Sequence, residues 1–272
     1  MYETNAFGID VSHYDAVVKW EELRGQVDFV IAKMGGTEDG IYEDDLFASH
    51  IAGAYGIGAI PMAYWYVAPR YWLESQQTMQ GVENISDDKH PILQRIMASL
   101  RNKAVYALFF DVEDYSLVTR SGQVTDTWLT FYVRDLVERL RRQMAKGNMR
   151  PVRLGVYSRR TFIDDFVKTL DVWLGTQPEL AIWCANWAGS GSVTGNMAAL
   201  RKDPIPVGHA PRAFGWAQAR AATWQFWQYS GDSGRVRICT SIFNDNGVMR
   251  AVDLNLYNGT REQLAAWLGI SQ

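Results

Sequence analysis

Two carboxylates stand two residues apart at the end of an apolar run. The run covers residues 107–110, and Asp111 and Glu113 follow it. A short apolar segment bounded by charge predicts a strand buried on both faces, as in a parallel sheet. Side chains alternate along a strand, so Asp111 and Glu113 should project to the same side. Two carboxylates in different surroundings are what glycoside hydrolysis requires, because one donates a proton while the other stays ionised.

This short motif has a simpler interpretation, a strand that runs into a solvated acidic turn. For the two residues alone we favour that interpretation. Two further predicted strands carry acids near their ends, namely Asp10 near the N-terminus and Asp253 near the C-terminus, with Asn255 two residues later. In barrels of alternating strands and helices, the C-terminal ends of the strands meet at one mouth. The four acids are therefore predicted to share one site although they lie far apart in sequence.

Eight segments have the apolar and β-branched composition of short strands: residues 7–12, 28–33, 58–66, 107–113, 152–157, 180–187, 223–229 and 251–255. Helical spacing of apolar residues predicts helices over residues 43–55, 73–85 and 125–146. A capping box at Thr260 and Gln263 opens a closing helix that Gly269 ends. Clear helices follow most of the first five strands only. The pattern predicts an α/β fold, an irregular TIM-like barrel of about five β/α units plus three further strands.

Three segments do not fit this pattern and are predicted to be insertions or loops: residues 86–104, 188–221 and 231–250. The first is polar and basic, and the second is rich in Gly, Ser, Pro and Ala with at most a short helix. No linker, repeat or low-complexity tract divides the chain. We therefore expect residues 1–272 to form one domain.

Composition excludes several classes of function. The net charge is −3 and the pI is about 5.8, so no basic patch for nucleic acid is expected. Four scattered histidines and two isolated cysteines form no metal-ligand spacing, so neither a metal nor an organic cofactor is expected. No apolar run is long enough to span a membrane, so no membrane insertion is expected. The 11 Trp and 13 Tyr favour a carbohydrate ligand, because aromatic faces stack on sugar rings.

Four motifs, taken in their order, resemble glycoside hydrolase family 25, the Chalaropsis-type lysozymes. They are Gly-Ile-Asp-Val-Ser-His (8–13), Asp-Val-Glu (111–113), Trp-Gln-Tyr-Ser (227–230) and Val-Asp-Leu-Asn (252–255). Supporting segments are Ala-Tyr-Trp-Tyr (63–66), Gly-Val-Tyr-Ser (155–158) and Trp-Cys-Ala-Asn-Trp (183–187). The chain departs from the family pattern at Tyr14 and Asp15, where Trp-Gln is common, and at Asn186 and Trp187, where Gln-Tyr is usual. The resemblance extends from about residue 6 to 258. It implies that residues 1–272 form a single catalytic glycoside-hydrolase domain, without a separate cell-wall-binding domain.

The resemblance implies a β-1,4-N-acetylmuramidase that cleaves peptidoglycan, with net retention. It implies Glu113 as the general acid/base, with Asp111, Asp10 and Asp253 as its acidic partners. Whether Asp111 attacks carbon or orients the substrate's N-acetyl group stays open. The candidate substrate-binding residues are Tyr64, Tyr157, Trp183, Asn186 and Gln228. For the two tyrosines and Trp183 the alternative is plain packing, and we expect His13 to be a structural, hydrogen-bonded histidine.

The resemblance also implies where the protein acts. Family members are common as phage endolysins and secreted autolysins, and the N-terminus shows no basic and apolar signal segment. We therefore expect a monomeric phage or prophage endolysin that stays in the cytoplasm until a holin releases it, or that travels on a phage particle. Its partners would be peptidoglycan strands. Basic residues of the two later loops could balance the anionic substrate: Arg201, Lys202, Arg212, Arg220, Arg235, Arg237 and Arg250.

Two other functions remain open. The first is a chitinase-type hydrolase or a glucosaminidase. A chitinase-type hydrolase also ends its fourth strand in acids, but its fuller motif D-x-D-x-E would need an acid where Phe109 stands. A non-catalytic glycan-binding barrel is the other alternative. The intact pair of Asp111 and Glu113 argues against it.

Overall fold

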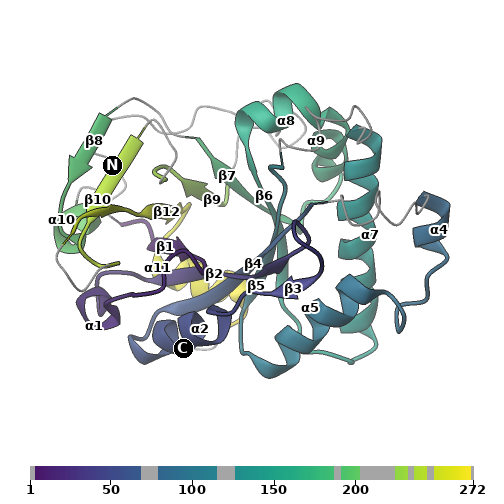
Figure 1. The fold of residues 1–272 in the computed structure, drawn as a ribbon, viewed down its shortest axis with the longest axis horizontal. Helices are drawn as coiled ribbons and strands as arrows, with labels where there is room; N and C mark the ends of the chain where they lie inside the picture. The colour runs from purple at the N-terminus through teal and green to yellow at the C-terminus, as the bar shows by residue number, and fades with distance from the viewer. Residues whose placement is uncertain are drawn as a thin grey trace.

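The computed structural model describes residues 4–68, 79–114, 126–186, 191–202, 224–231, 236–243 and 248–270. Eight strands close into a barrel because β1 pairs with β2 as well as with β12 (Figure 1). In order around the barrel they are β1 (Phe7–Val11), β12 (Asp253–Tyr257), β9 (Phe226–Gln228), β7 (Ala181–Ala185), β6 (Arg153–Arg159), β5 (Ala107–Asp111), β4 (Ile60–Tyr66) and β2 (Phe29–Gly36). A short strand, β3 (Tyr42–Glu43), extends the edge at β2.

The barrel has a regular and an irregular part, as predicted. Helices follow β1, β2, β4, β5 and β6, and three further strands, β7, β9 and β12, complete the barrel. All neighbouring barrel strands are parallel except that β12 runs antiparallel to β1 and β9. The helices are α1 (Trp20–Leu23), α2 (Phe47–Gly56), α4 (Met79–Glu83), α5 (Pro91–Asn102), α7 (Asp126–Ala145), α8 (Arg160–Phe166), α9 (Lys168–Gly175), α10 (Met197–Lys202) and α11 (Arg261–Leu268).

Aromatic side chains fill the barrel interior. The ring of Phe109 packs edge-to-face on Phe226 at 5.1 Å and on Trp183 at 5.3 Å between ring centroids. Gly155 on the neighbouring strand makes room for Phe109, because a Cβ there would lie 2.6 Å from that ring. Real Cβ atoms do not approach so closely, so the alternation of large and small residues fixes how these strands pack. The layer supports the mouth of the barrel from below.

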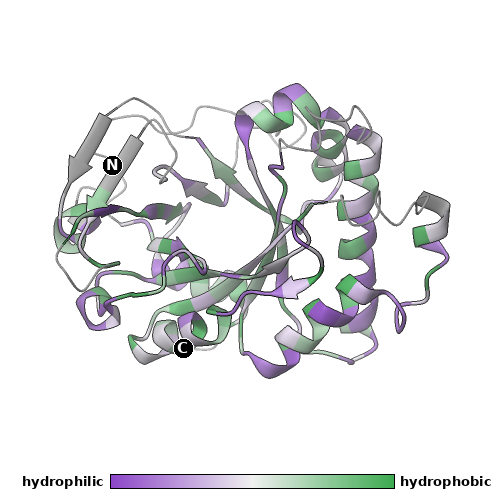
Figure 2. Cartoon of the chain, viewed as in Figure 1, coloured by the Kyte–Doolittle hydropathy of each residue, from purple (hydrophilic) through white to green (hydrophobic). Residues whose placement is uncertain are grey.

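Residues 86–104 are not an insertion, which corrects the prediction. They contain helix α5, which buries Ile92, Leu93, Ile96 and Leu100 against the outer core of the barrel. Pro91 occupies the first turn, and the Nδ1 atom of the preceding histidine accepts the Leu93 N–H at 3.2 Å. Figure 2 shows hydrophobic colour along the barrel strands and hydrophilic stretches on α5 and α7. Both helices therefore belong to the amphipathic layer around the barrel.

The segments predicted as long loops contain a second sheet. Strands β8 (Gly191–Thr194), β10 (Val236–Thr240) and β11 (Arg250–Ala251) form it in the order β11-β10-β8. In Figure 1 it lies on the side of the barrel away from α7. Residues 203–223, 232–235 and 244–247 lie outside the described residues. The first part of the predicted helix over residues 73–85, residues 73–78, lies outside them too, and α4 is described.

The closing helix begins and ends as predicted. Thr260 and Gln263 form the capping box of α11, and Gly269 follows it in the left-handed conformation with φ of +71°. Along the described ranges of the chain, no helix is long and apolar enough to cross a membrane.

Candidate active site

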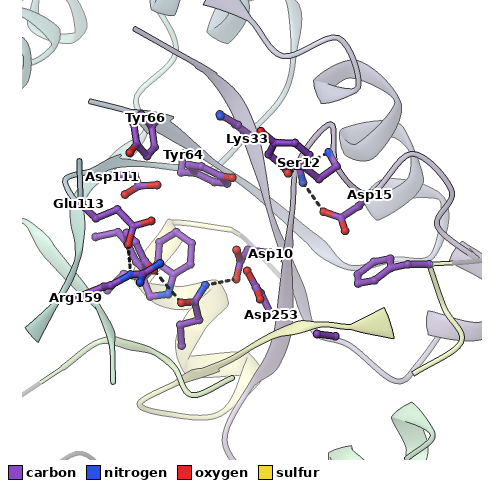
Figure 3. Close-up of a pocket in the computed structure, with 16 residues that line it drawn as sticks. Asp10, Ser12, Asp15, Lys33, Tyr64, Tyr66, Asp111, Glu113, Arg159 and Asp253 are labelled. Carbon is purple, nitrogen blue, oxygen red and sulfur yellow. Dashed lines mark hydrogen bonds and ion pairs between the residues drawn. The ribbon is translucent and has the colours of Figure 1, made fainter. Parts of the chain in front are cut away.

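A cavity of about 220 Å³ opens at the C-terminal ends of the barrel strands (Figure 3). It brings together eight of the nine predicted site residues: Asp10, Tyr64, Asp111, Glu113, Tyr157, Trp183, Gln228 and Asp253. The four acids come from three strands, β1, β5 and β12, and from the residues that follow β5. Closure of the barrel thus gathers groups that are up to 243 positions apart, from residue 10 to residue 253.

One side of the cavity is formed by β1 and β12, and we call it the β1–β12 side. Neutral amide groups hold the carboxylate of Asp10 there. Asp10 and Asp253 are register partners there. The Oδ2 atom of Asp10 accepts hydrogen bonds from Asn255 Nδ2 at 2.7 Å and from Gln228 Nε2 at 3.0 Å. Asp10 and both amide side chains are buried. The carboxyl of Asp10 is therefore fixed from two directions by groups that carry no charge.

A second set of hydrogen bonds orients these amides. Trp183 Nε1 donates to Asn255 Oδ1 at 2.8 Å, and the hydroxyl of Tyr157 donates to Gln228 Oε1 at 2.8 Å. Each amide oxygen is thereby occupied, so each NH₂ group must turn toward Asp10. Two predicted substrate contacts, Tyr157 and Trp183, thus also support an acid.

Burial governs the protonation of Asp10. Desolvation raises the pKa of Asp10 from 3.8 to about 7, although the hydrogen bonds from Asn255 and Gln228 lower it. The negative charges of Asp15 and Glu113 raise the pKa of Asp10 further. The carboxyl of Asp10 is therefore divided between its neutral and ionised forms near neutral pH.

Cations accompany the carboxylates on the opposite side, which we call the β5–β6 side. Asp111 pairs in register with Tyr66 on β4 and with Tyr157 on β6. Two residues further along β6, Arg159 Nε lies 2.5 Å from Glu113 Oε2 (Figure 3). The side chains of Glu113 and Arg159 are 17% and 30% exposed, so this ion pair lies partly within the cavity wall.

Asp111 is the carboxylate with an open acceptor. Its Oδ1 atom is buried and has no hydrogen-bond partner among the described residues. Desolvation and the charge of Glu113 raise the pKa of Asp111 well above its usual value, while Lys33 and Arg159 oppose this shift. A buried carboxylate oxygen without a donor costs free energy, so Oδ1 is an acceptor whose hydrogen-bonding capacity is unused.

The family of the chain follows from a comparison of its sequence with known families. The family described as glycosyl hydrolases family 25 matches residues 9–237. The chain belongs to this family. It is therefore a glycoside hydrolase, as the sequence motifs predicted. No curated protein sequence matches the chain.

Solved structures have the same fold as this family 25 hydrolase at low sequence identity. A bacterial lysozyme from Streptomyces coelicolor has a TM-score of 0.61 and 19% identity, with 98% of this chain and 99% of that chain covered. A muramidase from Trichobolus zukalii has a TM-score of 0.60 and 17% identity, with 98% and 100% covered. The catalytic domain of endolysin ply40 from bacteriophage P40 of Listeria monocytogenes has a TM-score of 0.53 and 16% identity, with 98% of each chain covered.

Asn186 is the one predicted site residue of the family 25 hydrolase that does not line the cavity. It stands three positions after Trp183, and side chains alternate along a strand, so the two face opposite sides. Its backbone N–H donates to Gln228 O at 3.1 Å, and its carbonyl accepts from Trp227 Nε1 at 2.8 Å. Asn186 thus joins β7 to β9 through its backbone and is an unsuitable candidate for substrate contact.

His13 lies outside the cavity of the family 25 hydrolase and contacts a buried acid, as expected for a structural histidine. Its Nδ1 atom lies 2.7 Å from Asp44 Oδ2, which also accepts the His13 backbone N–H at 3.1 Å. The following Tyr14 does line the cavity and is 76% exposed. After β1, His13 thus anchors the loop, and Tyr14 forms part of the cavity rim.

Sequence reasoning missed the two cations of the cavity, Lys33 and Arg159. Lys33 is buried within β2, and its Nζ lies 2.6 Å from Glu38 Oε1 and 5.3 Å from the ring centroid of Tyr66. Arg159 follows Tyr157 by two residues, so alternation along β6 could have identified it. The other cavity residues that were not predicted are Ser12, Tyr14, Asp15, Tyr66, Phe243 and Ala251.

Arg201 is a loop cation that differs from the prediction. Arg201 donates to both oxygens of Asp28, at 2.9 and 3.0 Å, and Asp28 directly precedes β2 at the end of the barrel away from the cavity. Arg201 therefore cannot balance a substrate charge at the mouth. Arg212, Arg220 and Arg235 lie outside the described residues, as do the side chains of Lys202 and Arg237.

Proposed function

We propose that this enzyme is a lysozyme, a β-1,4-N-acetylmuramidase that cleaves peptidoglycan between N-acetylmuramic acid and N-acetylglucosamine. The observation that carries the proposal is the pairing of Asp111 and Glu113 in one cavity with Asp10 and Asp253. Membership of family 25 supports the glycosidase chemistry. The lysozyme, muramidase and endolysin with the same fold support the choice of peptidoglycan as substrate.

Glu113 is the general acid in this proposal. A glycosidic oxygen leaves slowly unless it is protonated as its bond to carbon breaks. Glu113 stands at the rim of the cavity with a partly exposed side chain, where solvent can return its proton after each turnover. In the second half of the reaction Glu113 takes a proton from the attacking water.

Asp111 stabilises the positive charge that develops on the sugar ring. Its carboxylate, which lines the cavity, can either attack the anomeric carbon or accept the N–H of the substrate's acetamido group, whose oxygen would then attack. Both routes pass through a covalent or cyclic intermediate and lead to net retention. Asp253 and the ionised fraction of Asp10 contribute negative potential at the mouth, and Asp10 also fixes the amides beside it.

Aromatic side chains form the proposed sugar-binding walls. Tyr64, Tyr157 and Trp183 line the cavity, with the Tyr157 and Trp183 ring centroids 4.4 Å apart. Burial and the nearby acids hold the pKa of the Tyr64 hydroxyl well above its usual value, so it stays protonated as a hydrogen-bond donor. Gln228 is better suited to orienting Asp10 than to touching sugar, because both ends of its amide are occupied.

The cell wall is the proposed place of action, with peptidoglycan strands as the partner and a monomer as the acting form. The likeness to a phage endolysin catalytic domain supports a phage or prophage endolysin. Release through a holin pore, or carriage on a phage particle, would bring such an enzyme to its substrate.

Digestion of purified peptidoglycan tests the proposal. The products are reduced with borohydride and identified by mass, and muramicitol is the expected new reducing end. Glucosaminitol as the main product would indicate a glucosaminidase, and equal cleavage of chitin oligomers would indicate a chitinase-type enzyme. Glycan binding without any cleavage would indicate a non-catalytic barrel.

A further inference from the structure

The ion pair between Glu113 and Arg159 conflicts with the task proposed for Glu113. A general acid must carry a proton, whereas a guanidinium within hydrogen-bond distance favours the carboxylate form. Arginine keeps its charge at every pH that the enzyme meets, so this pairing cannot be relieved by deprotonation of Arg159. The ion pair thus favours the form of Glu113 that cannot start the reaction.

The pair is built into the barrel. Hydrogen bonds bring the ends of β5 and β6 together, since Val112 N donates to Tyr157 O at 2.9 Å and the Ser158 hydroxyl donates to Val112 O at 2.5 Å. Glu113 directly follows Val112, and Arg159 directly follows Ser158, so the two side chains face each other. The other charged and titratable groups that line this cavity are Asp10, Tyr14, Asp15, Lys33, Tyr64, Tyr66, Asp111, Tyr157 and Asp253, and Asp114 directly follows Glu113.

A substrate that carries an anion meets one suitable partner in this cavity. Among the described lining residues, only Lys33 and Arg159 are cationic. Lys33 is 6% exposed, with Nζ 2.6 Å from Glu38 and within 5.5 Å of the ring centroids of Tyr42 and Tyr66. Arg159 is 30% exposed at its side chain, and its planar fork suits a carboxylate. Muramic acid differs from glucosamine by a lactyl group, which carries a carboxylate itself or through the attached peptide.

We propose that Arg159 holds Glu113 as a carboxylate before substrate binds and then exchanges it for a carboxylate on the muramyl side of the substrate, which frees Glu113 to take up a proton. Arg159 is then a positioning residue that also determines specificity. The inference rests on the proposed muramidase function. It explains how a strongly acidic cavity can select an anionic sugar, and it makes activation of the acid depend on that sugar.

Kinetics on two matched substrates test the exchange. The substrates are stem-free glycan strands with free lactyl carboxylates and the same strands after methyl esterification. The wild type should show kcat/KM about tenfold or more higher on the free acid, as expected for a charge-assisted hydrogen bond. Arg159→Gln should bring the ratio of the two substrates close to one. A ratio unchanged from the wild type would overturn the proposal.

The pH profile on the esterified strands supplies a readout that a merely structural role would not move. Removal of the guanidinium favours protonated Glu113, so Arg159→Gln should move the alkaline limb of kcat/KM upward by on the order of one pH unit. An alkaline limb that coincides with the wild type would contradict the proposal. Arg159→Lys should keep the limb in place but lose much of the preference for the free acid, because an ammonium lacks the fork.

A neighbouring arginine provides the matched control. Arg160 is exposed on α8 and pairs with Asp164 at 3.2 Å, so Arg160→Gln should behave as the wild type in both assays. If thermal melting shows that Arg159→Gln is unfolded, the test rests on Arg159→Lys. Full retention of the preference for the free-acid strands by Arg159→Lys would then overturn the proposal.

Glycan strands that keep their peptide stems show which substrate carboxylate Arg159 binds. A higher kcat/KM of the wild type on these strands than on stem-free strands indicates a carboxylate of the stem, and a higher kcat/KM on the stem-free acid indicates the lactyl carboxylate. The products separate this inference from the proposed function. Glucosaminitol as the product would reject the muramidase function, but the ratio of kcat/KM on the free-acid and esterified strands would still be measurable.

Discussion

The two sides of the cavity hold buried carboxylates by different means. On the β1–β12 side, two neutral amides donate to Asp10 and are themselves fixed by Tyr157 and Trp183. On the β5–β6 side, Asp111 keeps an oxygen without a donor, and Glu113 is paired with a cation. Amide donors fix a position, whereas an ion pair fixes a charge and can be exchanged. The β1–β12 side is therefore suited to support, and the β5–β6 side to reaction.

Removal of the proton donor gives the largest expected effect. An amide of the same shape cannot donate a proton as an acid does, so Glu113→Gln should reduce kcat by about 10²–10⁴-fold with the fold intact. Release of soluble muropeptides and circular dichroism measure the two properties. Glu138→Gln, at an exposed residue of α7 paired with Arg134, is the control. A loss below about tenfold would remove Glu113 from its assigned role.

Asp10 should make stability fall with rising pH. Because its pKa is raised from 3.8 to about 7 in the fold, its stabilising effect is complete below pH 3.8 and is lost as pH rises through about 7. Asp10→Asn removes this titration. Denaturant unfolding from pH 4 to 8 should show that the wild type loses roughly 2–4 kcal/mol more than the variant. Parallel curves would mean that the β1–β12 side does not hold a neutral acid.

His13 lies outside the cavity, so its substitution should have the smallest effect on kcat. His13→Ala removes the ring that contacts Asp44, which keeps the backbone N–H as a donor. Unfolding free energy should drop by about 1 kcal/mol while kcat changes by less than about threefold. Denaturant titration and the muropeptide assay give both values, and a large loss of kcat with unchanged stability would assign His13 to catalysis.

Local patterns predicted much of the fold and of the site. The apolar run before Asp111, the amphipathic stretch that became α7 and the capping box of α11 depend on neighbours in sequence, so the chain reveals them directly. Helix α5 was also visible in principle, because Pro91 and its apolar residues have helical spacing. The basic and polar residues between these apolar positions led to the interpretation of residues 86–104 as an insertion.

Long-range pairing was beyond local patterns. Strand β8 gains its partner β10 more than 40 residues later, and no residue of either segment signals the other. Lys33 and Arg159 became site residues because the register of β2, β5 and β6 brings their ends to one mouth. Asn186 does not line the cavity, since it stands three positions after Trp183 and side chains alternate along a strand.

The division between the two sides is tested most directly by comparing two isosteric variants on one substrate. Asp111→Asn and Asp10→Asn each replace one carboxylate of the same cavity by an amide, and initial rates of peptidoglycan cleavage at pH 6 give their relative kcat. If Asp111 meets the charge of the reacting sugar and Asp10 supports the site, Asp111→Asn should be slower than Asp10→Asn by about tenfold or more. Equal losses, or an active Asp111→Asn enzyme beside an inactive Asp10→Asn enzyme, would contradict this division and move the role of Asp111 to the β1–β12 side.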